Sequence, residues 1–464
     1  MPLILPANTL SADAYDVANS CRFNTGDSPY MYKTVVSPTS ATISTVSFWM
    51  KAIGVTDKGI FAARTDTNNR HSIYWEGAGN ARLELWGKRS GSVTVEMHLT
   101  RAFRDSSAWV HHVIGIDTTQ ATAGNRVKWY VNGVQASIFT TETQVTEDSS
   151  LEWSVADSTI AVGAYAKTSG FGDYFDGYLA EVVFIDGIQY AASDFGEFDS
   201  DSPSTWKPKD PSGLTFGNNG FYLDFEASDN LGNDANGGTD LTESGLAAAD
   251  QATDTPTNNF CTGNPIIHGG KLPTISEGNC LFVSGGDWMH IPSTIGVANG
   301  KWYAEFKCVA KTGGQMMGVV DAGSIAGWGA SPPLYVGNDA LGHCYQDNGN
   351  KQTGDTATSY GATYTDGDII GAALNADDGE ITFYKNNAVQ ASGTAITLPT
   401  STSSDGIWFW LPSVETGTIA ANWGGCSAFA ISSAANDENG YGVFEYAPPS
   451  DYLAMCTKNL ATNG

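Results

Sequence analysis

The chain has 464 residues and a formal net charge of −27, with 41% hydrophobic and 16% charged residues. This length predicts about two to four domains, each large enough to bury a core without metals or disulfides. The acidity repels phosphate backbones and anionic lipid surfaces, so we expect no nucleic-acid partner. No stretch approaches the roughly 20 apolar residues that a membrane helix needs, and we therefore expect no membrane insertion.

The composition favours short strands joined by turns, because the chain has 53 glycines and 11% aromatic residues. Its seven cysteines are odd in number and widely spaced. This pattern predicts neither a disulfide framework nor a zinc site, but buried free thiols in a protein made in a reducing cytoplasm. The first 14 residues lack the basic region of a signal peptide, so we expect no export signal.

The first 190 residues contain many predicted strands. In residues 126–135, apolar Val127, Trp129 and Val131 alternate with longer polar side chains, and Asn132-Gly133 then predicts a tight hairpin turn. No long helical pattern competes with them. Other predicted strands occupy residues 42–52, 59–64, 72–77, 82–87, 93–99, 109–117, 159–166 and 177–187.

Residues 194–254 are acidic and rich in Gly, Asn, Ser and Pro, although residues 221–227 (FYLDFEA) carry aromatic side chains that could pack. We interpret this stretch as an extended connector that partly docks on its neighbours. Strands resume near Asn279, and the last residues from about 447 read as irregular. Later predicted strands occupy residues 300–309, 368–390 (a hairpin), 407–414 and 418–423.

Two regions resemble known families. The order of residues 109–117, 126–135, 159–166 and 177–187 is similar to a laminin G-like domain of the concanavalin A-like superfamily. Its cues are a Trp-x-His-His-Val strand, a Tyr-Val-Asn-Gly hairpin and a closing Gly-x-Leu-x-Glu-Val-x-Phe strand. The resemblance implies a β-sandwich over roughly residues 1–190.

The second region resembles a SPRY domain. Its opening strand is similar to residues 300–308, its diagnostic hairpin to residues 367–390 and its closing segment to residues 408–425, with Trp423 where Phe is commoner. The expected fold is therefore all-β, with two tandem antiparallel β-sandwich domains of the jelly-roll type, one concanavalin A-like and one SPRY-like. The expected boundaries are 1–193 for the first sandwich, 194–262 for the connector, 263–449 for the second sandwich and 450–464 for a C-terminal tail.

Residues 1–31, 217–238, 250–265 and 447–460 are similar to segments of marine bacteriophage structural proteins. The resemblance implies a virion protein that is made in the host cytoplasm and contacts other virion proteins. Two functions follow: a tail-fibre or spike adhesin that binds host surface glycans, or a capsid or tail decoration protein (a head fibre) that uses its sandwiches for protein–protein contacts. By analogy with phage appendages we expect a homo-oligomer, a trimer. The chain lacks the repeats of a fibrous shaft, which favours decoration, whereas lectin-like surfaces favour the adhesin.

A catalytic site is not expected. Retaining glycosidases need two carboxyl groups about 5 Å apart. Glu181 and Asp186 are separated by an odd number of positions, so on a strand they face opposite sides. The Gln/His/Arg/Tyr set of alginate lyases cannot be assembled from the sequence. His111 and His112 also face opposite sides and cannot chelate one ion, so we expect one in the core and the other exposed. We conclude that the chain is not an enzyme.

A calcium ion is the one cofactor to consider. Laminin G-like domains often hold Ca²⁺ at a loop rim, and Asp173 and Asp176 precede the predicted closing strand. Because Ca²⁺ takes about six to eight oxygen ligands, two carboxylates do not define a site. The alternative is that both are solvated loop carboxylates.

Carbohydrate binding is the expected activity, because sugars stack on exposed aromatic rings. The long Gly- and Pro-rich stretch 327–346 is typical of a binding loop. The alternative is that these rings close the rim of a large sandwich. Candidate ligand-binding aromatics are Tyr165, Phe171 and Tyr174 in the first domain and Trp328, Tyr335 and Tyr345 in the second.

Overall fold

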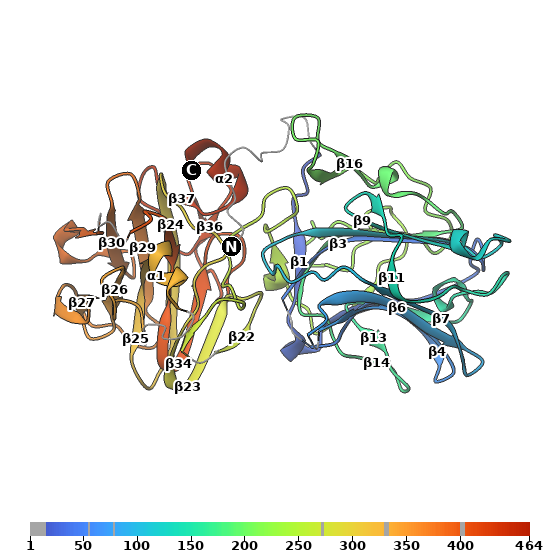
Figure 1. Ribbon diagram of the computed structural model, residues 1–464, viewed down its shortest axis with the longest axis horizontal. Helices are drawn as coiled ribbons and strands as arrows, with labels where there is room; N and C mark the ends of the chain where they lie inside the picture. Colours follow the sequence, from blue (N-terminus) through green and yellow to red (C-terminus); the bar gives the residue numbers. More distant parts are fainter. Residues whose placement is uncertain (1–14, 54–55, 78, 271–272, 329–333, 400–403) are drawn as a thin grey trace. The chain divides into compact units, whose positions relative to one another are not determined.

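The computed structural model describes residues 15–53, 56–77, 79–270, 273–328, 334–399 and 404–464. The chain divides into two compact units, an N-terminal unit that ends at Thr257 and a C-terminal unit that starts at Asn258. In the described residues both units consist mainly of antiparallel strands (Figure 1). The predicted all-β sandwich fold class is thus confirmed.

The N-terminal unit has two eight-stranded sheets, which we call the first and the second sheet. In spatial order the first sheet contains β10 (Val134–Gln135), β9 (Val127–Val131), β8 (Val110–Asp117), β3 (Ile43–Ala52), β15 (Gly177–Asp186), β1 (Ser20–Phe23) and β20 (Gln251–Ala252), with β18 (Phe221–Leu223) also paired to β15. The second sheet contains β11 (Phe139–Thr143), β7 (Ser92–Leu99), β6 (Arg82–Arg89), β5 (Asn69–Glu76), β4 (Lys58–Asp66), β12 (Thr159–Val162), β2 (Tyr30–Thr34) and β19 (Thr242–Ser244).

Smaller elements complete this unit. Two hairpins are β13 (Tyr165–Ala166) with β14 (Phe171–Gly172), and β16 (Gly196–Phe198) with β17 (Trp206–Pro208). Figure 1 places β13 and β14 on the side of the second sheet that faces away from β3 and β9. Short 3₁₀ helices occupy Thr25–Asp27, Ala123–Asn125, Glu152–Ser154, Ala192–Asp194 and Ala248–Asp250.

The core of this unit lies between the two sheets, as the alternating sequence pattern predicts. On β9, Val127, Trp129 and Val131 are buried, while the residues between them are half-buried. The predicted Asn132-Gly133 turn is present: Val131 pairs with Val134, and both turn residues have positive φ, which Asn and Gly adopt at low cost. Phe61 and Leu85 from the second sheet join Trp129 in one cluster of buried side chains.

We expected residues 194–262 to form a connector, but residues 194–257 belong to the N-terminal unit and supply five of its strands. β18 pairs with β15, β20 with β1 and β19 with β2, whereas β16 and β17 pair with each other. Each pairing satisfies backbone groups that would otherwise form an open sheet edge. The aromatic residues 221–227 therefore enter the core as a strand and its continuation.

A buried ion pair fixes the end of this segment. Lys51 on β3 and Asp254 are fully buried, and Lys51 Nζ lies 2.6 Å from Asp254 Oδ2. The other carboxylate oxygen accepts a 3.0 Å hydrogen bond from Trp109 Nε1, and the Asp254 carbonyl accepts one from Ser20 Oγ. The segment thus returns to the first sheet through charged and neutral hydrogen bonds together.

Both members of the His111–His112 pair are buried, so the prediction that one is exposed is wrong. They do face opposite sides of β8: His112 accepts a hydrogen bond from Trp129 in the core, and His111 accepts one from Trp206 on the outer side. The reason for the burial of His111 is that Trp206, from residues 194–257, covers the outer face of the first sheet. Burial lowers the pKa of His111 to about 3, so it stays neutral.

Glu181 lies at a β-bulge where β15 changes its partner from β1 to β18. Its φ of 50° is in the left-handed region, which non-glycine residues rarely adopt. The buried carboxyl group accepts hydrogen bonds of 2.9 Å from the Tyr222 hydroxyl. Burial is the main reason that its pKa rises from 4.5 to about 8, so the carboxyl group is protonated at neutral pH.

The C-terminal unit contains a 15-stranded hydrogen-bonded sheet. Within it, β34 pairs with β23, with β24 and, near its start, with β25, so one strand links the halves of the sheet. Its strands are β21 (Gly269–Gly270), β22 (Thr274–Ser276), β23 (Leu281–His290), β24 (Lys301–Lys311), β25 (Gln315–Asp321), β26 (Gly342–Gln346), β27 (Asn350–Thr353), β28 (Thr356–Ser359), β29 (Ile369–Asn375), β30 (Glu380–Lys385), β31 (Ala388–Val389), β32 (Ile396–Thr397), β33 (Trp408–Trp410), β34 (Ser413–Asn422) and β37 (Leu453–Ala454). Separate elements are the hairpin β35 (Ala435–Asn436) and β36 (Val443–Phe444), the helices α1 (Ala322–Ala326) and α2 (Thr457–Asn463), and a 3₁₀ turn at Ala391–Gly393.

The last residues, expected to be an irregular tail, are part of this unit. β37 pairs in parallel with β24, and Met455 and Leu460 lie in the main core cluster. Apolar residues at positions 453, 455 and 460 gain burial only by docking. As predicted, the cysteines form no disulfide in the described residues, and all are buried except the half-buried Cys426.

We predict that Lys51→Met destabilises the N-terminal unit by about 3–5 kcal/mol, because it leaves the Asp254 carboxylate buried without its cation. Urea unfolding of the full chain measures this loss. The control is Lys167→Met, which breaks a surface ion pair with Asp173 and should cost about 0–1 kcal/mol. An equal loss in the two variants would contradict the importance of the buried pair.

We further predict that Glu181→Gln is stabilised relative to the wild type as the pH rises from about 4.5 to about 8. In this window the unfolded wild-type chain ionises Glu181 while the folded chain keeps the proton, so the wild type alone loses stability from this group. Urea unfolding at both ends of the window tests the difference. Exposed Glu142→Gln is the control, and a difference that stays constant with pH would refute the assignment.

Candidate functional site

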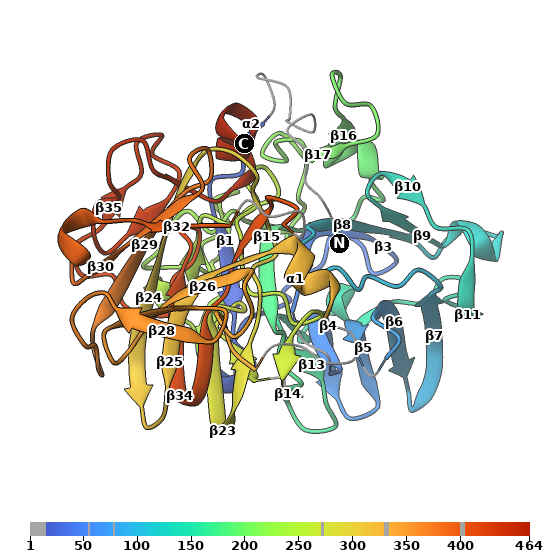
Figure 2. The same cartoon turned by 60° about the vertical axis from the view of Figure 1, so that its left-hand side comes forward.

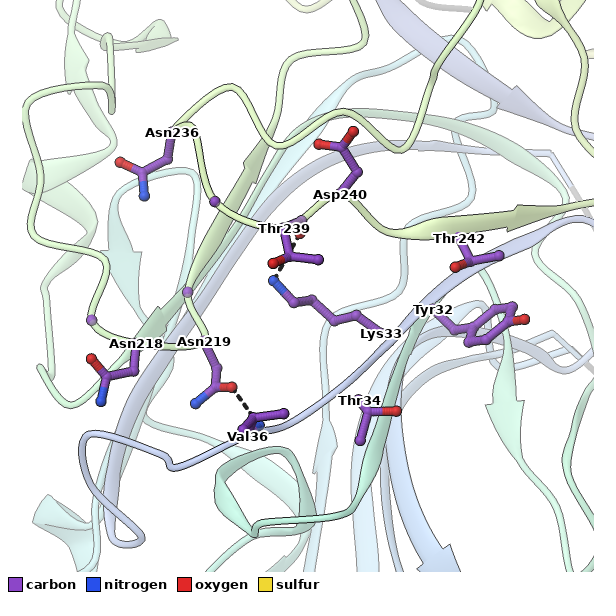
Figure 3. Close-up of a pocket in the computed structure, with 13 residues that line it drawn as sticks. Tyr32, Lys33, Thr34, Val36, Asn218, Asn219, Asn236, Thr239, Asp240 and Thr242 are labelled. Atoms are coloured by element: carbon purple, nitrogen blue, oxygen red, sulfur yellow. Dashed lines mark hydrogen bonds between the residues drawn. The ribbon is translucent and has the colours of Figure 1, made fainter.

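A pocket of about 550 Å³ opens at the edge of the N-terminal unit beside β2 and β19 (Figure 3). We call it the edge pocket. Two loops from residues 194–257 form much of its wall, and β2 with the residues that follow it forms the rest. The residues that line it are Tyr32, Lys33, Thr34, Val36, Gly217, Asn218, Asn219, Gly220, Asn236, Gly238, Thr239, Asp240 and Thr242.

Asn219 anchors the first loop. Its backbone N–H and its side-chain amide both donate to Asp186 Oδ2, at 3.1 and 3.0 Å, and its carbonyl oxygen accepts from the Val36 backbone at 2.7 Å. The side chain is buried, so its amide serves the fold. Neighbouring Asn218 is exposed, and its amide nitrogen donates to the Ser37 carbonyl while its side chain borders the pocket.

Asp234 and Asp240 shape the second loop. Asp234 Oδ1 accepts hydrogen bonds from the backbone of Tyr222 and Asn236, and the Asp234 backbone donates to Asp240 Oδ1. Gly238 passes so close that a Cβ there would lie 2.3 Å from Asp234 Oδ2. Burial raises the pKa of Asp234, whereas the hydrogen bond from the Asp234 backbone lowers the pKa of Asp240. The loop is thus fixed by its own carboxylates.

Lys33 crosses the pocket. Its ammonium group donates to the Thr239 carbonyl at 3.0 Å and lies 5.5 Å from the centre of the Phe221 ring. Burial lowers the pKa of Lys33, while Asp234 and Asp240 act in the opposite direction. Because an ammonium group has three donors, Lys33 keeps hydrogen-bonding capacity for a ligand.

Several polar side chains of the wall have no partner inside the protein. Within the described residues, no hydrogen bond is made by the side chains of Asn236, Thr239 or Thr242. All three are exposed and line the pocket (Figure 3). An amide and two hydroxyls that face a cavity can exchange hydrogen bonds with the hydroxyl groups of a sugar.

Aromatic rings continue from the pocket across the second sheet. Tyr30 and Tyr32 flank buried Met31 on β2, so both point to the outer face of the sheet. The Tyr30 ring lies 5.5 Å from that of Tyr32, 5.7 Å from that of Tyr174 and 5.9 Å from that of Phe171, measured between centroids. We call these four half-buried rings the aromatic stripe.

The structure therefore brings together two of the predicted aromatics, Phe171 and Tyr174, with the unexpected Tyr30 and Tyr32. The third, Tyr165, lies on β13, where its ring is 5.2 Å from Tyr74 and 6.4 Å from Trp86. All of these side chains are half-buried. The stacking role assigned to the three predicted residues remains a proposal.

The predicted aromatics of the second domain lie elsewhere. Trp328 and Tyr345 are buried, so these two rings are not available for stacking on a sugar. Tyr345 is inside strand β26 and Trp328 follows α1, and both are packed in core clusters because each ring gains more by burial than by exposure. Tyr335 is half-buried and donates to Asp355. Part of the expected binding loop, residues 329–333, lies outside the described residues.

The predicted calcium ligands do not fit a calcium site. Asp173 pairs with Lys167. One carboxylate oxygen of Asp176 is buried and has no hydrogen-bond partner in the described part of the chain. Burial raises the pKa of Asp176, and the nearby Lys58 offsets only part of this rise. In the same residues, no group of three or more His, Cys, Asp or Glu side chains is placed to hold a metal ion. These carboxylates supply too few oxygens for Ca²⁺.

The suspected acid pair is also separated. Glu181 accepts a hydrogen bond from the Tyr222 hydroxyl, whereas Asp186 accepts hydrogen bonds from the backbone of Thr39 and Asn219. Each carboxyl group is buried and serves the fold.

In the described part of the structure, no helix is long and apolar enough to cross a membrane.

The edge pocket itself was missed by the sequence analysis. Its walls come largely from residues 217–242, which we assigned to the connector because of their Gly, Asn and Asp content. The same residue types build tight turns and present amides to ligands, so composition alone does not separate the two roles. The aromatic residues 221–227 inside the stretch were the available signal that it packs.

Comparison with known proteins agrees with the fold of the N-terminal unit. Residues 25–188 match a family model described as the concanavalin A-like lectin/glucanases superfamily. The predicted concanavalin A-like domain is therefore confirmed over this range. No curated protein has a sequence that matches this chain.

Similar solved structures include the SPRY domain of human HERC1, at 15% identity and a TM-score of 0.28, covering 36% of this chain and 99% of that one. A native heptameric SAP-like pentraxin from Limulus polyphemus is similar at 17% identity and a TM-score of 0.30, over 38% of this chain and 80% of that one. A candidate carbohydrate-binding protein from Bacteroides ovatus ATCC 8483 is similar at 15% identity and a TM-score of 0.35. The match covers 49% of this chain and 58% of that protein.

Proposed function

We propose that this chain is a carbohydrate-binding protein and that the edge pocket, with the adjoining aromatic stripe, holds the glycan. The observation that carries the proposal is the set of unpartnered polar side chains of Asn236, Thr239 and Thr242 around a pocket beside Tyr32. Sugars need hydrogen-bonding groups for orientation and ring faces for stacking, and both occur here. The lectin-containing superfamily matched by residues 25–188 supports the same activity. The proposal requires neither catalysis nor a metal.

In its biological setting we propose a bacteriophage virion protein, acting as a tail-fibre or spike adhesin that binds host surface glycans. The support is the similarity of residues 1–31, 217–238, 250–265 and 447–460 to phage structural proteins. A homotrimer on the particle, next to other virion proteins, would raise the avidity of weak single sites by roughly 10²–10⁴. The alternative is a capsid or tail decoration protein whose sandwiches contact other virion proteins.

We predict that Asn236→Ala combined with Thr239→Val weakens glycan binding by about tenfold, since two hydrogen bonds to the sugar are lost while none inside the described protein is broken. Fluorescently labelled full chain on a printed array of defined oligosaccharides measures binding, followed by titration with the best-bound glycan. The control, Asn125→Ala with Thr122→Val, removes the same groups from an exposed turn. Binding should also survive EDTA. Equal binding by the pocket variant, or no bound glycan, would reject the proposal.

For the virion setting, we expect gold-labelled antibody against the chain to mark the distal tail of the phage that encodes it. Purified chain should then block adsorption of that phage to cells, because it occupies the same glycans. Labelling of the capsid without an effect on adsorption would favour the decoration protein. Particles without any label would overturn both assignments.

A further inference from the structure

Three cations lie in a row on the outer face of the second sheet. Arg64 on β4 pairs in register with Arg70 on β5, and Arg70 pairs with Lys88 on β6. The neighbouring inward-facing residues are core residues such as Ala63, so the three side chains share the outer face. Figure 2 shows β4, β5 and β6 side by side. We call these residues the cation row.

This arrangement is costly for the fold by itself. Like charges directly opposite each other on neighbouring strands destabilise a sheet. Two other arginines of the same sheet are neutralised: Arg82 pairs with Glu76 and Glu84, and Arg89 pairs with Glu152. In the described part of the chain, the cation row has no such ion pair, although acidic residues far outnumber basic ones overall.

The two arginines also retain unused donors. The Nε atoms of Arg64 and Arg70 are buried and have no hydrogen-bond partner in the described part of the protein. Arg64 uses one terminal nitrogen for the Thr168 carbonyl. Asp66 is close enough for Arg64 to lower its pKa slightly, but its main partners are the backbone and side-chain amides of Asn68 and Asn69. The buried Nε atoms are out of a ligand's reach, but in the described part of the protein the other terminal nitrogens of Arg64 and Arg70 make no hydrogen bond and can take an anion.

Aromatic rings lie beside the cation row. The Arg70 guanidinium lies 5.4 Å from the centre of the Trp86 ring. The Trp86 ring packs near that of Tyr165, which in turn packs against the ring of Tyr74. The Tyr74 hydroxyl donates to buried Glu84, which Arg82 also holds. Rings that are fixed before binding lose little conformational entropy when a ligand arrives.

We propose that the cation row and the ring of Trp86 form a second binding site, and that it takes an anionic sugar bearing carboxylate or sulfate groups. A planar guanidinium group binds either anion through two parallel hydrogen bonds, and the sugar face stacks on the neighbouring ring. The ligand class rests on the proposed carbohydrate-binding function, but the residues are distinct from those of the edge pocket. A nucleic acid is a poorer fit, because specific complexes use about 6–10 phosphate contacts and this chain is strongly acidic.

Affinity electrophoresis of the full chain tests the site, with polygalacturonate, dextran sulfate or neutral dextran in the gel. We expect retardation by at least one of the two anionic polymers. The triple variant Arg64→Gln, Arg70→Gln, Lys88→Gln should weaken it by at least about tenfold, because hydrogen bonds between ionised groups are lost. The polymer that retards the chain identifies the anionic group.

The control variant, Arg101→Gln, Arg104→Gln, Lys128→Gln, removes the same charge elsewhere in the N-terminal unit and should bind as the wild type does. The proposal would be overturned by an equal loss of retardation in both variants, or by no retardation with either anionic polymer. It would also be overturned if neutral dextran retarded the wild type and the triple variant lost that retardation as well. So would equally tight binding of single-stranded DNA. The edge-pocket variant Asn236→Ala, Thr239→Val should retain anionic-polymer binding, so failure of the pocket proposal is distinguishable from failure of this one.

Discussion

The buried ion pair between Lys51 and Asp254 is the constraint on which the N-terminal unit depends. Neither charge reaches solvent, so each needs the other, and Trp109 satisfies the remaining carboxylate oxygen. The pair holds the end of residues 194–257 against the first sheet. Residues 194–257 must therefore run along the sandwich, where their strands pair with β15, β1 and β2. The edge pocket is a product of that closure, since its two loops belong to this segment.

The N-terminal unit combines features that suit glycan binding. Carboxyl groups inside it serve the fold: Asp186 and Asp234 hold loops, and Glu181 stays protonated at a bulge. The unpartnered side chains of Asn236, Thr239 and Thr242 instead face the edge pocket, and the cation row lies on an outer sheet face. This separation explains how a protein with a net charge of −27 can still present a local cationic surface. Within about a Debye length, 8–10 Å in physiological salt, nearby charges outweigh the distant net charge.

Sequence reasoning located some candidate site residues and misplaced others for identifiable reasons. Phe171 and Tyr174 follow a Gly-rich turn, so their partial exposure could be read locally, and they pack with Tyr30 and Tyr32. The Tyr345 ring packs against the rings of Tyr364 and Phe383, which come from later segments, so its burial could not be read from its neighbours along the chain. His111 is buried for the same kind of reason, because its cover, Trp206, comes from a segment that resembles a linker.

The amino-acid sequence by itself determined many of the longer strands, the Asn132-Gly133 turn and the sandwich class. Two of these features are local: the alternation at Val127, Trp129 and Val131, and the Asn132-Gly133 turn. Each depends on neighbouring residues in the sequence and not on how distant segments pack. Only the tertiary structure decided where ligands could bind. Lys33 meets Thr239 through long-range closure, and Arg70 meets Lys88 through strand register. Register depends on the packing of entire strands against a shared core, so no short stretch of sequence encodes these contacts.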